Sequence, residues 1–186
     1  MKPTVAIFGG SFSPVHEGHV AVARGIIEAG MADEVWVTPC RQNPLKEEGS
    51  IMPDELRLSL LRKALEYANN GYESPKIKLC DRELTMPSPS FTADTMRTLM
   101  EEHPDVIFRL AVGADSYRDF EKWKDWEWLE RNFAPIVYPR PGSHPGELRK
   151  GWTLLKGMKE YNVSSSAIRE MMRKGETAEK FMPWIK

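Results

Sequence analysis

The sequence predicts an α/β fold with a doubly wound, mostly parallel sheet, and two features of the chain indicate it. Short apolar runs alternate with segments whose apolar residues recur at helical spacing. The first run, residues 4–8, stops at two glycines and leads into a helical pattern, the order found at ligand-binding turns of such sheets. The 186 residues fit one domain, 1–186, and we expect its last part, 164–186, to be helical.

Each element follows from its own apolar spacing. Partly β-branched or apolar runs predict strands at 4–8, 34–38, 76–80, 106–112 and 134–138, with a weaker strand within 152–163. Apolar residues at helical spacing predict helices at 17–29, 54–69, 92–102, 115–131 and 166–174. Helix 54–69 carries Leu56, Leu60, Leu61 and Leu65 at helical spacing. Ser90 or Thr92 is the expected N-cap of helix 92–102.

Charge and cysteine content exclude several classes of protein. Lys and Arg total 26 and Asp and Glu total 27, so no net positive field attracts nucleic acid or an anionic membrane. A phosphate-binding site must therefore be built locally. Cys40 and Cys80 form no C-x-x-C pair, which favours a reduced, cytoplasmic protein. The first apolar run is too short for a signal peptide or a membrane span.

The segment GGSFSPVHEGH, residues 9–19, lies between the first expected strand and the first expected helix. Gly9 and Gly10 allow a sharp turn and close approach to a ligand. The helix start offers free N–H groups to a phosphate, and His16 and His19 share one helix face. Zinc is a competing use of paired histidines, but the spacing differs from H-E-x-x-H and no third ligand is obvious. Together these features favour phosphate binding over a plain turn with surface histidines.

A second segment, VSSSAIR, covers residues 163–169. Ser164 or Ser165 is a natural N-cap for the following helix, and Arg169 lies about one turn into it. Hydroxyls, helix-start N–H groups and a guanidinium suit phosphate oxygens. For an isolated motif of this kind, ordinary capping with a solvated Arg is the favoured interpretation.

Together the two segments resemble the H-x-G-H nucleotidyltransferase superfamily. Two further stretches, PSFTADT at 89–95 and VGADSYRDFEKW at 112–123, resemble motifs of the bacterial nicotinate-nucleotide adenylyltransferases, and the resemblance runs from residue 5 to about 183. It implies a Rossmann-like nucleotidyltransferase domain that transfers AMP from ATP to nicotinate mononucleotide. The products would be deamido-NAD and pyrophosphate, in NAD biosynthesis, with Mg²⁺ accompanying ATP.

The resemblance also implies roles for individual residues. The catalytic phosphate donors would be His16, His19 and Arg169. The ATP-binding residues would be Gly9, Gly10, Ser11, Phe12, Gly18, Lys46, Gly113, Asp115, Ser164 and Ser165. The mononucleotide would contact Ser11, Phe91, Thr92 and Trp123, with the Trp123 indole stacked on the pyridine ring. No protein ligand to a metal is expected.

Three departures from the family pattern bear on these roles. Ser13 stands where the family commonly has Asp, and Ser can still accept a main-chain hydrogen bond. Leu45 stands where many members have His, which weakens the phosphate role of that loop. A final helix that follows a proline matching Pro183 is expected to be shortened or absent here, since the sequence ends at Lys186.

The sequence leaves several alternatives open. A phosphopantetheine or cytidylyl branch of the superfamily, or a non-catalytic nucleotide-binding paralogue, would share the two main motifs. The preference for nicotinate over nicotinamide mononucleotide and the presence of a homo-oligomer are undetermined. Trp126 and Trp128 are expected to pack in the core or an interface, and Arg140 is equally compatible with a phosphate contact and a surface position.

Overall fold

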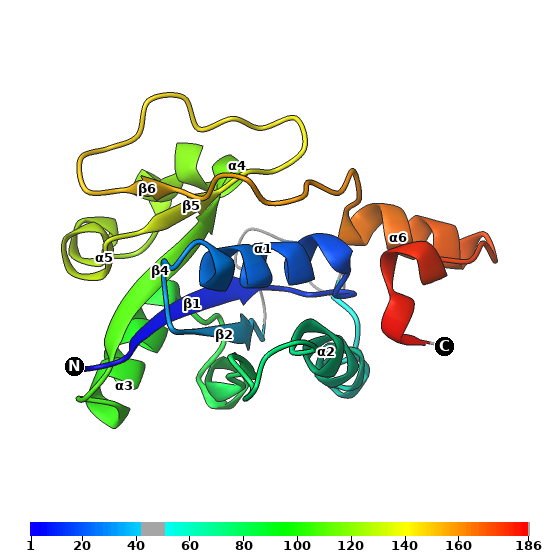
Figure 1. Cartoon of the computed structure of the whole chain (residues 1–186), viewed down its shortest axis with the longest axis horizontal. Coiled ribbons are helices and arrows are strands. Elements are labelled where there is room, and N and C mark those ends of the chain that lie inside the picture. The colour runs from blue at the N-terminus through cyan, green and yellow to red at the C-terminus, as the bar shows by residue number, and fades with distance from the viewer. Residues whose placement is uncertain (42–50, 186) are drawn as a thin grey trace.

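A computed structural model describes residues 1–41 and 51–185, and it contains one six-stranded sheet (Figure 1). The strands are β1 (Thr4–Gly10), β2 (Glu34–Pro39), β3 (Ile77–Leu79), β4 (Ile107–Gly113), β5 (Ile136–Tyr138) and β6 (Thr153–Leu154). Their order is β3-β2-β1-β4-β5-β6, and every neighbouring pair is parallel. The predicted parallel α/β fold is confirmed.

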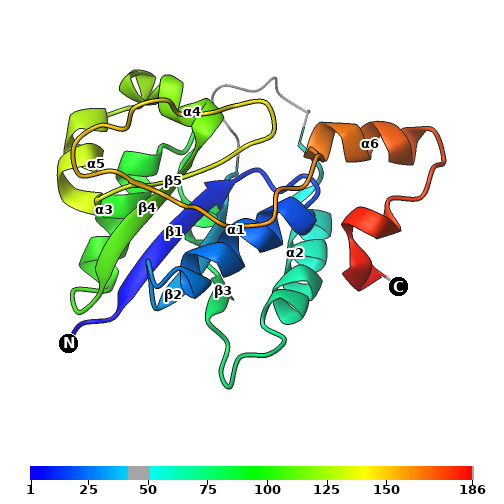
Figure 2. The ribbon, with the colours of Figure 1, turned by 45° about the horizontal axis from the view of Figure 1, so that its top comes forward.

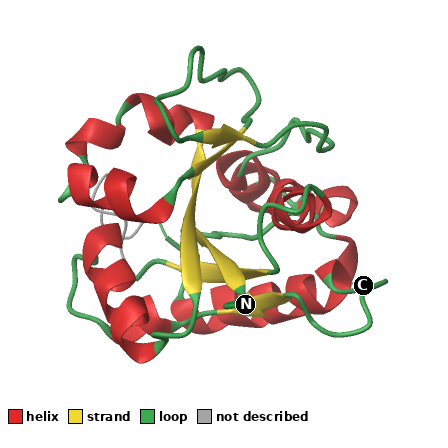
Figure 3. Ribbon diagram, turned by 60° about the vertical axis from the view of Figure 1, so that its left-hand side comes forward, coloured by secondary structure: helices red, strands yellow, loops and turns green. Residues whose placement is uncertain are grey.

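Helices cover both faces of the sheet (Figure 3). The helices are α1 (Glu17–Glu28), α2 (Asp54–Ala68), α3 (Thr92–Glu102), α4 (Ala114–Arg118), α5 (Trp126–Phe133) and α6 (Ser165–Arg173). Ala6 and Phe8 of β1 pack with buried residues of α1 and α2, whereas Val5 and Ile7 pack with those of α3 and α5. This alternation follows from the two-residue period of a strand and explains why β1 is apolar throughout. Across the described ranges, no helix combines the length and the apolar character needed to span a bilayer.

The strand order reverses at β1, which defines the place where a ligand can bind. The chain first builds outward through β2 and β3, then crosses to the other side of β1 and continues with β4. The connections leaving β1 and β4 therefore diverge and open a crevice beyond their carboxyl ends. Gly10 ends β1 and Gly113 ends β4. Figure 2 shows α4 and α6 on either side of the point where β1 ends.

The expected helix 115–131 is wrong, because the structure divides it into three pieces. α4 ends at Arg118, a single 3-10 turn covers Phe120–Lys122, and α5 begins only at Trp126. Asp125 has φ of 53°, a left-handed conformation that is uncommon for a residue other than glycine and that breaks the helix. Trp123 consequently lies on a turn between two short helices.

The expected cap of α3 is also wrong. Thr92 is the first residue of the helix, and Phe91 precedes it without a side-chain cap. Ser90 instead donates its hydroxyl hydrogen bond to the buried carboxylate of Glu83. Among the residues that the structure describes, none caps the first N–H groups of α3 with its side chain.

The leucines of helix α2 differ in burial. Leu56 is 45% exposed, whereas Leu61 and Leu65 are buried. The buried positions are Arg57, Leu61, Ala64, Leu65 and Ala68. A charged residue therefore begins the apolar stripe of this helix, and its partners lie at the carboxyl edge of the sheet.

The orientation of α2 predicts unequal effects of two leucine truncations. Leu61→Ala removes a side chain that is 1% exposed and should lower the free energy of unfolding by about 2–5 kcal/mol. Leu56→Ala should change it by no more than about 0.5 kcal/mol. Urea unfolding of both variants measures the difference, and equal losses would contradict this orientation of the helix.

Candidate active site

The turn after β1 is anchored in the core by Phe12. This residue has φ of 44° and is 1% exposed, and its ring packs edge-on against Phe8 with the centroids 5.3 Å apart. The imidazole of His19 lies 4.9 Å from the same ring. A left-handed aromatic residue is unusual and is maintained here by its burial. Only the main chain of Phe12 is placed to contact a ligand.

Arg57 also fixes the turn after β1, through hydrogen bonds to its main chain. Its guanidinium Nη1 donates to the carbonyl oxygens of Ser11 at 2.7 Å and of Cys40 at 2.9 Å. Nη2 pairs with Asp54 at 2.5 Å, while the Arg57 side chain itself is only 1% exposed. One buried cation thus joins the loop after β1 to the end of β2. Sequence reasoning missed Arg57, although a charge in helical register with Leu61 was a visible signal.

The two histidines are brought into contact at the start of α1. The His16 main-chain N–H donates to Nδ1 of His19 at 3.1 Å, and the two ring centroids are 3.8 Å apart. A Cβ atom on Gly18 would lie 3.0 Å from the His16 ring. Gly18 therefore provides the space into which the His16 imidazole packs, which gives a steric reason for glycine between the histidines.

His16 is held neutral. It is 2% exposed, and neither ring nitrogen has a hydrogen-bond partner among the residues that the structure describes. Burial, and secondarily the positive charge of Arg140, lower the pKa of His16 from 6.5 to about 4. A buried imidazole without a partner is ready to donate a hydrogen bond to a ligand, since its polar atoms are otherwise unsatisfied.

The start of α6 docks onto the loop that follows β1. Ser164 accepts the N–H of Ala167 at 3.1 Å, which confirms it as the N-cap. Ser165 donates to the carbonyl of Pro14 at 2.9 Å, and Arg169 Nη1 donates to the carbonyl of Ser13 at 2.5 Å. Residues more than 150 positions apart are thereby joined. Arg169 is held against the loop and not directed freely into solvent.

At the end of β4, the side chains of Asp115 and Tyr138 pack closely against the main chain of Gly113. A Cβ atom on Gly113 would lie 2.5 Å from Asp115 Oδ1 and 3.1 Å from the Tyr138 hydroxyl, so a larger residue here would displace the Asp115 carboxylate and press on Tyr138. Arg140 Nε lies 3.4 Å from the same Asp115 oxygen. Arg140, left open by the sequence, thus faces both Asp115 and the histidines. The hollow at this place is lined by residues of α1, of the end of β5 and of the segment before α6: His16, Gly18, His19, Tyr138, Arg140, Tyr161 and Val163.

The residues expected to hold a pyridine ring come from two other segments. Phe91 and Thr92 form the entry to α3, and both are half-buried. Trp123 follows the 3-10 turn and packs against Phe120, with ring centroids 5.1 Å apart. Trp126 and Trp128 pack against the same core cluster, as expected.

A buried carboxylate, which sequence reasoning missed, supports the loop before α3. Glu83 is 8% exposed and accepts the hydroxyl hydrogen bond of Ser90. Burial raises the pKa of Glu83, while the bonds from Ser90 and Thr95 and the charge of Arg57 oppose the rise. The sequence signal was weak, because Glu83 lies in a short polar stretch without a periodic pattern.

Two of the singled-out positions, Leu45 and Lys46, lie outside the described residues. Ser13, the position where the family commonly has Asp, accepts the main-chain N–H of Met52 at 2.8 Å, the kind of bond expected of it. Within ranges 1–41 and 51–185, no group of three or more His, Cys, Asp or Glu side chains is arranged to hold a metal ion.

Comparison with known proteins defines the class first. A family model described as cytidylyltransferase-like matches residues 7–171. Among solved structures, the nicotinic acid mononucleotide adenylyltransferase of Plasmodium falciparum complexed with NaAD superimposes with a TM-score of 0.75, at 24% identity, covering 97% of this chain and 90% of that one. The structural similarity supports the fold. The match to the family model makes the chain a member of the cytidylyltransferase-like proteins.

Curated relatives narrow the class. The probable nicotinate-nucleotide adenylyltransferase of Bacteroides fragilis is 34% identical over 97% of this chain and 88% of its own length. Its counterpart in Bacteroides thetaiotaomicron is 36% identical over 92% and 82%, and that of Halalkalibacterium halodurans is 33% identical over 96% and 84%. The chain therefore belongs to the nicotinate-nucleotide adenylyltransferase family.

The lowered pKa of His16 predicts a pH dependence of stability. Between pH 6.5 and 4 the unfolded chain takes up a proton at His16 that the folded chain does not, so stability falls as the pH is lowered. The full effect is about 3 kcal/mol. The free energy of unfolding by urea is measured across this pH range for the wild type and for His16→Gln. The difference between the two curves gives the contribution of His16, because all other groups titrate in both proteins. Parallel stability curves would contradict a neutral buried His16.

Proposed function

We propose that this protein transfers AMP from ATP to nicotinate mononucleotide, giving deamido-NAD and pyrophosphate. The observation that carries the proposal is the neutral imidazole of His16, which has no hydrogen-bond partner within residues 1–41 and 51–185 and lies beside His19 just after β1. The family relationship supplies the substrate class. We further propose that the whole chain acts as one nucleotidyltransferase domain in the cytoplasm.

The reaction requires positioning more than proton transfer. A phosphate oxygen of the mononucleotide, already ionised at neutral pH, attacks the α-phosphorus of ATP. A new P–O bond forms as the bond from the α-phosphorus to the oxygen that bridges to the β-phosphorus breaks, and pyrophosphate leaves with that electron pair. Since the nucleophile carries no proton that must be removed, no general base is needed. The barrier arises from bringing two anions together and from charge that builds on the phosphates.

The proposed donors suit this charge development. His16 and His19 would donate to oxygens of the reacting phosphates, and Arg169 would bind the β- and γ-phosphates beside the N–H groups at the start of α6. Ser164 and Ser165 shape that helix start. His16 is held by packing against Gly18 and His19, and Arg169 by its bond to the Ser13 carbonyl. These groups therefore need little reorganisation when charge develops. Arg140 would add a further positive charge, since it faces the same hollow.

The remaining proposed contacts concern orientation. The turn at Gly9, Gly10 and Ser11 and the main chain of Phe12 and Gly18 would approach ATP closely, and Gly113 and Asp115 would bind its adenosine. Lys46 retains its predicted role near the phosphates. The mononucleotide would lie between Ser11, the Phe91–Thr92 entry to α3 and the Trp123 indole, whose electron-rich face attracts an electron-poor pyridinium.

Magnesium is proposed to arrive with ATP as part of the substrate. Mg²⁺ keeps several waters and binds phosphate oxygens with few protein ligands, so a dedicated cluster of carboxylates is not required. When bound, it neutralises charge on the leaving pyrophosphate. We propose neither a nucleic acid nor a membrane as a partner, and a homo-oligomer is not needed for the proposed site.

The product identifies the substrate directly. We expect ATP and Mg²⁺ with nicotinate mononucleotide to yield deamido-NAD and pyrophosphate, detected by mass spectrometry and a pyrophosphate-coupled assay. Nicotinamide mononucleotide and phosphopantetheine, offered in turn, serve as competing acceptors. Turnover of phosphopantetheine with neither pyridine mononucleotide would contradict the proposal and favour another branch of the superfamily.

A further inference from the structure

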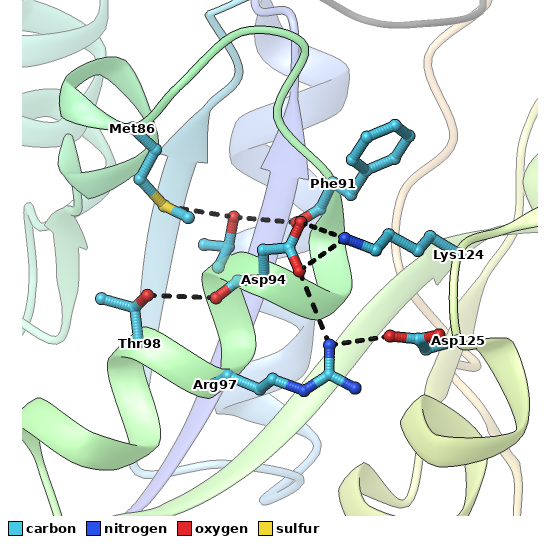
Figure 4. A network of polar contacts seen from close by, with 8 residues as sticks. Met86, Phe91, Asp94, Arg97, Thr98, Lys124 and Asp125 are labelled. Carbon is cyan, nitrogen blue, oxygen red and sulfur yellow. Dashed lines mark hydrogen bonds and ion pairs between the residues drawn. The ribbon is translucent and has the colours of Figure 1, made fainter.

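Two half-buried walls of the proposed pyridine pocket come from segments that do not follow one another in the chain. Phe91 and Thr92 lie at the entry to α3, whereas Trp123 lies on the turn before α5. The separation between these walls decides how well a flat ring fits between them. Figure 4 shows a network of polar contacts in which the side chains of Lys124 and Asp125, the two residues that follow Trp123, meet Asp94 and Arg97 of α3, with Phe91 close by.

The central contact of this network joins Lys124 to Asp94. The Lys124 Nζ atom lies 2.9 Å and 2.8 Å from the two carboxylate oxygens of Asp94, in the first turn of α3. The same ammonium lies 5.2 Å from the centroid of the Phe91 ring. Lys124 is the residue directly after Trp123. Its side chain therefore ties the Trp123 turn to the helix start that carries Phe91 and Thr92.

A second cation extends the connection. Arg97, one turn further along α3, pairs with Asp125 at 2.8 Å and with Asp94 at 3.6 Å. Its guanidinium also lies 4.3 Å from the centroid of the Trp128 ring. Positive and negative groups alternate along the network, so each charge faces the opposite sign. Both residues that follow Trp123 are consequently anchored on the same helix.

The turn needs such anchoring because its backbone is strained. Asp125 has φ of 53°, and the Trp123 N–H bonds the nearby Phe120 carbonyl at 3.0 Å. A left-handed aspartate persists where surrounding contacts hold it. The side chains of Lys124 and Asp94 are 44% and 35% exposed, so their pair contributes little to global stability. Its consequence is local: it determines the position of one pocket wall relative to the other.

We propose that Lys124 and Asp94 are positioning residues for the mononucleotide, which set the separation between the Trp123 and Phe91 walls of its pocket. This inference rests on the proposed function. It assigns no contact between either charge and the substrate. ATP is held at the other side of the crevice by His16 and the start of α6, so its binding should be insensitive to the pair.

The test is a set of charge-removing variants that keep side-chain size, with steady-state kinetics against both substrates. Lys124→Met and Asp94→Asn should each raise KM for nicotinate mononucleotide by roughly fivefold or more, because small displacements in a site are costly. KM for ATP and kcat at saturating mononucleotide should change by less than about twofold. Tm should shift by less than about 3 °C. The double variant should be no worse than either single one, since both remove the same contact.

Two further variants make the result decisive. Lys124→Arg preserves the charge and should restore most of the affinity for the mononucleotide. Lys78→Met is the matched control, because Lys78 pairs with Glu34 at 2.6 Å with 45% exposure of the lysine side chain, at the start of β2 and away from the pocket. It should leave both KM values unchanged.

The outcomes separate the two proposals. If the wild type forms no dinucleotide from nicotinate mononucleotide, the proposed function fails and the positioning role fails with it. If the wild type is active but Lys124→Met has an unchanged KM for the mononucleotide, only the positioning role is overturned. A fall in Tm with equal losses toward both substrates would likewise overturn it, because that result describes a purely structural ion pair.

Discussion

The buried guanidinium of Arg57 is the constraint on which the site depends. It bonds the carbonyls of Ser11 and Cys40, so the segments that follow β1 and β2 are held at fixed positions at the edge of the sheet. Removing one member of a buried charged network typically costs about 3–5 kcal/mol, because its partners remain unpaired. With the loop fixed in this way, Phe12 enters the core, Ser13 and Pro14 receive the start of α6, and His16 packs against Gly18.

This arrangement suits the proposed role of the two imidazoles and Arg169 as fixed phosphate donors. His16 and His19 lie at the start of α1, directly after the loop that follows β1. Arg169 lies on α6 and bonds the Ser13 carbonyl of the same loop. His16 is neutral because burial opposes its charged form, and it can still donate one N–H. The reacting groups are already ionised phosphates, so the contribution of the protein is orientation and complementary charge, with no change of its own protonation required.

The sequence predicts the sheet and most helices because apolar periodicity is a local signal. It predicts a phosphate-binding turn after β1 because glycines and histidines occur together between a strand and a helix. It fails where tertiary contacts decide. The stretch around Trp123 contains no Gly or Pro, so it resembles a continuous helix, whereas Lys124 and Asp125 are bonded to α3 and interrupt it. Ser90 looks like a cap but bonds Glu83, and Arg57 looks like a surface charge until its partners are known. The roles of individual site residues, Lys46 among them, remain predictions.

The most direct test is to measure whether the loss of the His16 imidazole lowers the rate of AMP transfer or weakens the binding of ATP. In His16→Ala, steady-state turnover at saturating concentrations of both substrates gives kcat for AMP transfer, and equilibrium titration gives Kd for ATP. Because charge on the phosphates grows in the transition state, we expect kcat to fall roughly 10²- to 10³-fold while Kd for ATP changes by less than about threefold. A raised Kd with an unchanged kcat would contradict the account, because His16 would then bind substrate and transition state equally.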